Sequence, residues 1–150
     1  MSHHDNTIVV GFDGSPAGVA ALRWAVAQSR RYAGARVTAV HVHAPEAAFV
    51  PAMSMGIQPH GAPHPDHDAA ALARLVDEVS TETVAHGQVD LAEVPGRSGR
   101  VLAEAARDTL LVVIGAHHTA PRLADGVGAF AAEVVRHAHC PVAIIPADRA

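Results

Sequence analysis

TIVVGFDGSP, residues 7–16, is the stretch that decides the fold of this 150-residue chain. Residues 7–12 are almost all apolar, and a short apolar run without polar alternation is typical of a strand buried on both faces. An Asp-Gly pair ends the run, Ser15 is a favourable N-cap, and Pro16 suits the first position of a helix. The stretch therefore predicts a buried strand that leads directly into a helix.

The alternation of apolar strands and amphipathic helices continues along the chain. The first helix has one apolar stripe and is expected to end at Gly34. Further strands are predicted over residues 36–43, 88–94, 110–114 and 140–146, and further helices over residues 68–86, 98–106 and 128–138. This βαβαβαβαβ order predicts an α/β fold, a single domain over residues 1–150 with an open, doubly wound parallel sheet and helices on both faces.

The strand order of an open α/β sheet predicts where a ligand would bind. Ligands bind beyond the carboxyl ends of the strands, at the point where the strand order reverses. Asp13 follows the first predicted strand and Gly115 follows the fourth. If these two strands are neighbours across the reversal, Asp13 and Gly115 face one crevice, and the candidate site lies there.

Charge and composition exclude several classes of protein. The chain has 11 Lys and Arg residues, all of them arginine, against 15 Asp and Glu, and its net charge of −4 leaves no broad basic surface for nucleic acid. The single cysteine, Cys140, allows no internal disulfide and favours a reducing compartment. No apolar run approaches the roughly 20 residues that span a membrane, and the N-terminus has no apolar signal segment. We expect a cytoplasmic protein that binds neither nucleic acid nor membrane.

Residues 44–67 are rich in proline, and we expect them to form a flexible loop that partly covers the crevice. The segment and its end hold His60, His64, Asp66, His67 and Asp68. Histidine and carboxylate side chains are metal ligands, but this spacing matches no established metal-binding signature. We therefore expect a solvated loop and no specific metal site.

Two groups of residues share a pattern with one known family. The first is VVGFDGSP at residues 9–16 with ALRWA at 21–25, and the second is LVVIG at residues 111–115, Gly128, the Val134-Val135 pair and CPV at 140–142. In order and spacing the whole chain resembles the universal stress protein family. The resemblance implies a five-stranded parallel sheet in the order 3-2-1-4-5 and a homodimer formed through the last strand, which runs from Cys140 to Pro146.

Many members of that family bind ATP through a motif of glycine, two residues, glycine, nine residues, glycine and then Ser or Thr. Gly115 and Gly128 match its first and third glycines, His118 stands at the second glycine, and Ala129 stands at the hydroxyl position. Glycine lets backbone N–H groups approach phosphate closely, so the two replacements imply a degraded phosphate motif. A protonated His117 or His118 would offer phosphate a different partner.

The adenine half of the family's site is better matched. Asp13 corresponds to the family's aspartate near the adenine, and Val42 to the valine beside it; the alternative for Asp13 is an Asx turn before the first helix. The candidate nucleotide-binding residues are Phe12, Asp13, Val42, Gly115, His117, His118, Gly128, Ala129 and Phe130. The ligand expected is ATP or another adenine nucleotide, with Mg²⁺ only in its company. His41 also matches a common family residue, which we expect to be packed with a satisfied hydrogen bond.

These features leave two functions open. The first is a non-catalytic stress-response module with an adenine-nucleotide site. The alternative is a dimeric interaction or regulatory protein that binds no nucleotide and acts on a protein partner. Weak ATP hydrolysis has less support, because no residue is placed to position an attacking water, and we predict no catalytic residue.

Overall fold

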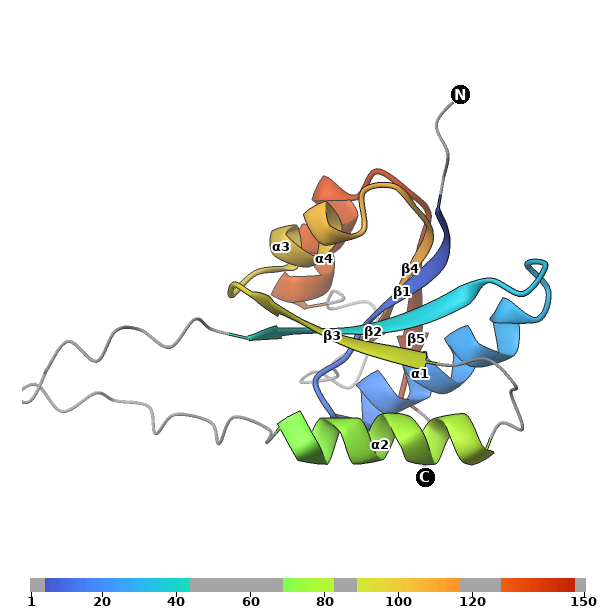
Figure 1. Ribbon diagram of the computed structural model, residues 1–150. Helices are drawn as coiled ribbons and strands as arrows, with labels where there is room; N and C mark the ends of the chain where they lie inside the picture. The colour runs from blue at the N-terminus through green and yellow to red at the C-terminus, as the bar shows by residue number, and fades with distance from the viewer. Residues whose placement is uncertain (1–4, 44–68, 83–88, 117–127, 148–150) are drawn as a thin grey trace, which may run out of the picture.

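A computed structural model describes residues 5–43, 69–82, 89–116 and 128–147 of the chain, which contain five strands and four helices (Figure 1). In chain order these are β1 (Asp5–Gly11), α1 (Pro16–Ser29), β2 (Arg36–His43), α2 (Ala69–Glu82), β3 (Val89–Pro95), α3 (Gly99–Ala105), β4 (Thr109–Ala116), α4 (Ala129–His137) and β5 (Val142–Pro146). All strand pairs are parallel and the order is β3-β2-β1-β4-β5, which confirms the predicted sheet.

Helices cover both faces of the sheet, α1 and α2 on one side and α3 and α4 on the other (Figure 1). The buried side chains of β1 alternate between the two layers. Ile8 and Val10 pack with Leu22 of α1, whereas Val9 packs with Leu102 of α3. Burial on both faces explains why the strand is apolar without alternation.

The beginning of α1 forms as predicted. Pro16 is its first residue, and the Oγ atom of the N-cap Ser15 accepts a hydrogen bond from the Gly18 N–H at 3.1 Å. A hydroxyl at this position satisfies one of the N–H groups that the first helical turn leaves without a partner. The sequence-encoded cap therefore fixes the direction in which the chain leaves β1.

The predicted end of this helix at Gly34 is wrong, because α1 ends at Ser29. The Ser29 hydroxyl donates to the carbonyl oxygen of Val26 at 2.8 Å. Ala33 and Gly34 then adopt positive φ angles of 51° and 74°. The left-handed conformation that Gly34 supports belongs to the turn into β2, several residues beyond the helix.

Several strand boundaries also differ from the predictions, and the last strand, predicted to begin at Cys140, begins at Val142. β1 begins at Asp5, whose N–H donates to the carbonyl oxygen of Asp108 at 2.9 Å, and ends at Gly11 rather than Phe12. Gly115 lies inside β4, which continues to Ala116. Of the predicted helix over residues 68–86, residues 69–82 are confirmed; the predicted loop over residues 44–67 lies outside the described residues.

Candidate functional site

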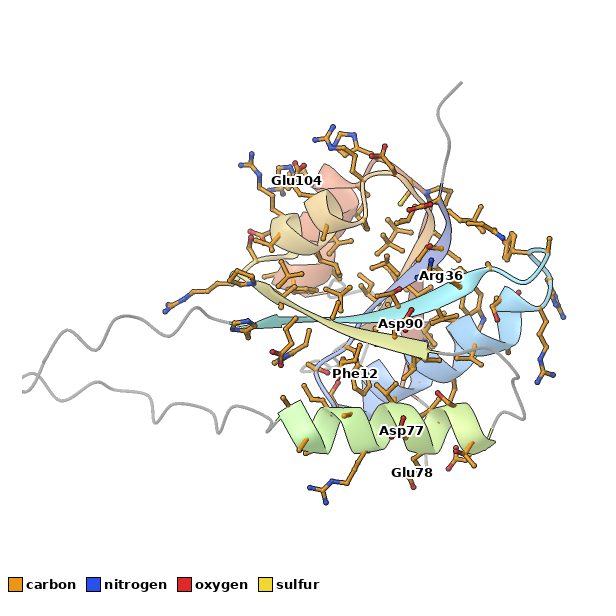
Figure 2. The ribbon with its side chains drawn as sticks, in the orientation of Figure 1. Phe12, Arg36, Asp77, Glu78, Asp90 and Glu104 are labelled. Atoms are coloured by element: carbon orange, nitrogen blue, oxygen red, sulfur yellow. The ribbon has the colours of Figure 1, made fainter. Side chains whose placement is uncertain are left out.

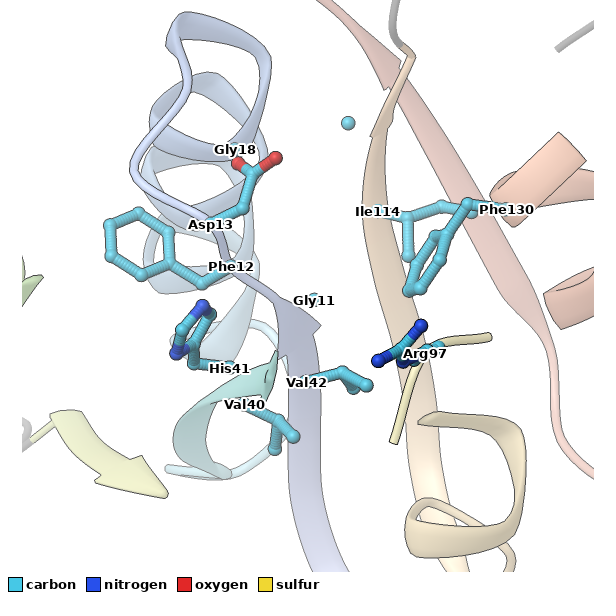
Figure 3. A pocket seen from close by; sticks show the side chains of 11 residues that line it. Gly11, Phe12, Asp13, Gly18, Val40, His41, Val42, Arg97, Ile114 and Phe130 are labelled. Carbon is cyan, nitrogen blue, oxygen red and sulfur yellow. The ribbon is translucent and has the colours of Figure 1, made fainter. Parts of the chain in front are cut away.

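A cavity of about 270 Å³ lies beyond the carboxyl ends of β1 and β4, where the strand order reverses (Figure 3). β1 and β4 are paired neighbours, so the predicted crevice between Asp13 and Gly115 is confirmed. The cavity is lined by Gly11, Phe12, Asp13, Gly18, Val40, His41, Val42, Arg97, Ile114, Gly115 and Phe130.

Most of the described candidate residues meet in this cavity. Those that line it are Phe12, Asp13, Val42, Gly115 and Phe130. Gly128 and Ala129 are not among the lining residues, although they directly precede Phe130 at the start of α4. His117 and His118 lie outside the described residues, so their predicted contact with phosphate stays a prediction.

Phe12 belongs to the core as much as to the cavity. Its side chain is only 2% exposed and packs with Leu72 and Val76 of α2, between the sheet and that helix (Figure 2). A buried aromatic ring at this position makes a rigid apolar wall. Phe12 therefore forms the part of the cavity wall that faces the hydrophobic core.

Asp13 forms the Asx turn that was the structural alternative for this residue. Its Oδ1 atom accepts a hydrogen bond from the Ser15 N–H at 2.9 Å. Glycine at position 18 leaves room for the carboxylate, because a Cβ there would lie 2.9 Å from the same Oδ1. The turn fixes the carboxylate at the cavity wall, and a carboxylate has enough acceptor sites to bind a ligand as well.

Gly115 has a packing role that the nucleotide motif did not reveal. A Cβ at this position would lie 2.5 Å from the carbonyl carbon and oxygen of Ala17. Real side chains do not approach backbone this closely, so glycine allows β4 to pass directly against the first turn of α1. The residue matters for the fold whether or not a phosphate binds beside it.

Among the described residues, no side chain caps the first turn of α4. Ser15 caps α1, and the Gly99 N–H at the start of α3 donates to Glu133 Oε2 at 2.9 Å. The N-cap of α4 is Gly128, with φ 87° and ψ 158°, and no side chain among the described residues accepts from its first turn. These N–H groups, with the positive end of the helix dipole, favour an anion.

His41 lines the cavity, and the satisfied hydrogen bond predicted for it is not found at Nδ1. The side chain is 13% exposed, and its Nδ1 atom is buried without a hydrogen-bond partner among the described residues. Glu93 pairs with His41 in the register of β2 and β3, but its Oε1 stays 4.0 Å from Nδ1. This distance is too long for a hydrogen bond.

Arg97 is the charged residue of the described lining that the sequence-based candidates did not include. It is exposed, lies in the turn between β3 and α3, and projects beside Val42 and Phe130 in the view of Figure 3. Its position after a parallel strand was the available signal, because every such turn opens at the carboxyl edge of the sheet.

Other candidate chemistry finds no support in the described part of the chain. It contains no cluster of three or more His, Cys, Asp or Glu side chains that could hold a metal, and the loop histidines considered above fall outside it. Cys140 is half-buried, with Sγ 3.6 Å from the carbonyl oxygen of Ala106, as expected for a packing residue. None of the described helices has the length and apolarity needed to cross a bilayer.

Comparison with known proteins identifies the family to which the chain belongs. Residues 6–146 match the model of the universal stress protein family. The chain is 30% identical over 144 residues to the universal stress protein Rv2623 of Mycobacterium tuberculosis, an alignment that covers 92% of this chain and 46% of that protein. The chain thus spans about half the length of the curated relatives it matches.

Solved structures give the same fold. A universal stress protein in complex with cAMP has a TM-score of 0.66 at 20% identity and covers 95% of this chain and 97% of its own. A family protein from Arabidopsis thaliana with AMP bound has a TM-score of 0.59 at 16% identity, covering 95% and 92%. At these identities the likeness shows the fold, and the ligands are those of the relatives.

Proposed function

The chain belongs to the universal stress protein family, and we propose that it is a non-catalytic member that binds an adenine nucleotide in the cavity beyond β1 and β4. The observation that carries the proposal is the convergence of residues from four separate segments on one cavity at the strand-order reversal. The residues are Phe12 and Asp13, Val42, Gly115, and Phe130, all of them candidates predicted from the sequence. Relatives crystallised with cAMP and with AMP support the class of ligand.

The base of the nucleotide would occupy the end of the cavity near Asp13. Val40 and Val42 supply apolar surface from β2, and Asp13 supplies a carboxylate held by its turn. A carboxylate accepts hydrogen bonds only, so it suits an amino group such as that of adenine. Apolar walls with one fixed polar group are the usual construction of a small-molecule site.

The phosphate would lie at the first turn of α4. No described side chain caps the N–H groups of this turn, and the N-cap Gly128 has open space where a side chain would lie. Ala129 lacks the hydroxyl that the family motif places there. A hydrogen bond to a charged group is worth about 1.5–3 kcal/mol, so we propose that the phosphate motif is degraded and that affinity is about tenfold or more below that of a complete motif. Mg²⁺ would bind only with the nucleotide.

Isothermal titration calorimetry with AMP, ATP plus Mg²⁺, and GMP tests this proposal. We expect saturable binding of the adenine nucleotides at a ratio of one per chain and weaker binding of GMP. Ala129→Ser, which restores the hydroxyl on an exposed residue, should strengthen AMP binding about tenfold. Absence of heat with every nucleotide up to millimolar concentration would leave the second candidate function, a dimeric interaction protein without a nucleotide site.

The observation in favour of an interaction role is the edge strand β5. It pairs only with β4 in the described sheet, and its residues 142–145 are uncharged, apolar and half-buried. The opposite edge, β3, carries Asp90, Glu93 and Pro95, the kinds of residue that discourage pairing. We propose that β5 forms a homodimer, which is compatible with either function.

A further inference from the structure

Arg97 places a permanent positive charge in the described lining of the cavity. Among the described residues that line it, Asp13 is the carboxylate and Arg97 is the group that stays positively charged throughout the ordinary pH range. Figure 3 shows the two at different places: Asp13 lies above Phe12 and His41, whereas Arg97 points toward the side on which Phe130 and Ile114 lie. The cavity is therefore electrostatically asymmetric, with its positive side toward α4.

No described carboxylate neutralises this guanidinium. Ion pairs join Arg23, Arg36 and Arg107 to acidic partners at 4.0 Å or less, but none involves Arg97. The Glu133 carboxylate of α4 accepts from the Gly99 N–H at the start of α3 and is not paired with Arg97. An arginine without an acidic partner at a cavity wall offers its fork of N–H donors to a ligand, and this geometry suits phosphate.

The turn that carries Arg97 is anchored. The Gly96 N–H donates to the carbonyl oxygen of His43 at 2.7 Å, which extends the ladder between β2 and β3 by one bond. Two residues further on, Gly99 lies against α4 so closely that a Cβ would meet the Phe130 carbonyl oxygen. The Arg97 backbone is thus held between the strand ends and the beginning of α4, on the side where the uncapped N–H groups lie.

We propose that Arg97 binds the phosphate of the nucleotide and sets the preference of the site for phosphorylated ligands over nucleosides. The inference rests on the proposed function and deepens it. The guanidinium supplies, from the turn after β3, a charge-assisted contact that compensates for the hydroxyl missing at Ala129. Because the contact is made only to phosphate, its loss should weaken nucleotide binding without weakening nucleoside binding.

The test is calorimetric titration of AMP and adenosine into the wild-type protein and three variants. Arg97→Gln removes the charge, and Arg97→Lys keeps the charge but lacks the paired N–H donors of the guanidinium. Arg100→Gln is the control, because it removes an exposed arginine of α3 that does not line the cavity. We expect AMP to bind the wild-type protein about tenfold more tightly than adenosine, and Arg97→Gln to lose most of that preference with adenosine affinity unchanged. Arg97→Lys should keep a larger part of it. Arg100→Gln should behave as wild type.

Salt dependence supplies a second readout. Raising the salt concentration should weaken AMP binding to the wild-type protein more than to Arg97→Gln. Added ions screen the attraction between Arg97 and the phosphate, and the variant lacks that attraction. The inference is overturned if Arg97→Gln keeps the wild-type preference for AMP, or if it loses AMP and adenosine affinity equally. Failure of the wild-type protein to bind either ligand is a distinct result: it refutes the proposed function, and this inference with it.

Discussion

Gly18 lies in the first turn of α1, where its missing side chain leaves room for the Asp13 carboxylate. In Gly18→Ala, the new Cβ would lie 2.9 Å from Asp13 Oδ1 and 3.4 Å from Ser15 Oγ. We expect the carboxylate to be displaced and AMP affinity to fall about tenfold, as for a lost hydrogen bond to a charged group. Unfolding stability should change by less than about 1 kcal/mol, because alanine favours the helix.

Gly34→Ala is the matched control for that variant. Gly34 has a φ of +74° and open space around it, far from the cavity. Alanine there is strained and should lower the free energy of unfolding by about 1 kcal/mol with AMP affinity unchanged. Urea denaturation and calorimetry measure both quantities. Unaltered AMP binding in Gly18→Ala would show that the position of the Asp13 carboxylate is unimportant for the ligand.

Gly115→Ala separates the packing role of a motif glycine from its role toward the ligand. The added Cβ would lie 2.5 Å from the backbone of Ala17, so β4 and α1 must move apart. We expect the ligand-free protein to lose about 1–3 kcal/mol of unfolding free energy, as overpacked cores do. Urea denaturation without nucleotide measures it, and an unchanged midpoint would contradict the close contact.

Among the elements, α3 carries an exposed ion pair at its C-terminal end. Glu104 and Arg107 lie 2.7 Å apart, and the Arg107 guanidinium lowers the pKa of Glu104 below its usual value of 4.5 (Figure 2). A carboxyl group with a lowered pKa in the folded state stabilises the protein above its unfolded pKa, and the stabilisation is lost as pH falls through the folded value.

The corresponding prediction concerns Glu104→Gln. Its melting temperature should be slightly lower than that of the wild-type protein at pH 7, and the difference should disappear below about pH 4. Thermal unfolding followed by circular dichroism across pH 3–7 measures this. A difference that persists at pH 3 would assign the effect to something other than the charge of Glu104.

At the scale of the elements, features that depend on neighbouring residues are predictable from the sequence, and features that depend on distant residues are not. Residues 7–16 determine the strand, cap and helix start locally, so the sequence predicts the cap and helix start correctly and the strand to within two residues at each end. The cap of α3 was not predictable, because Glu133 reaches it from 34 positions along the chain. The predicted end of α1 at Gly34 is too late because a glycine with positive φ occurs in a turn as readily as at a helix terminus.

At the site the same distinction between local and long-range features holds. Asp13 and Gly115 could be assigned to one crevice because chain topology alone brings the ends of β1 and β4 together. The contribution of Arg97 depends on how the turn after β3 is oriented, and the environment of His41 depends on how far Glu93 reaches. Such distances follow from packing and are not encoded in residue spacing.

For the whole molecule, the register of the sheet identifies a backbone position that tests the dimer. Val112 pairs with Val142 and donates to the carbonyl oxygen of Pro141 at 3.0 Å, so the N–H of Val142 points away from β4. Proline at position 142 would remove this outward donor and place a ring at the free edge. We expect Val142→Pro to shift the protein from dimer to monomer in sedimentation velocity at micromolar concentration.

Val89→Pro is the control, because Val89 is likewise the first residue of an edge strand. Gly96 donates to the carbonyl oxygen of His43, which pairs with Pro95, so the Val89 N–H points away from β2. This variant should remain a dimer. A wild-type monomer, or dissociation of both variants alike, would refute pairing through β5; circular dichroism confirms that each variant is folded.

The measurement that tests the central claim most directly is a ¹H–¹⁵N NMR titration of the wild-type protein with AMP, because it reports binding and location together. The account predicts saturable shifts concentrated at the cavity and the start of α4, among them the amides of Asp13, Val42, Gly115 and Phe130. No shift up to millimolar AMP, or shifts confined to the outer surfaces of α1 and α2, would contradict it.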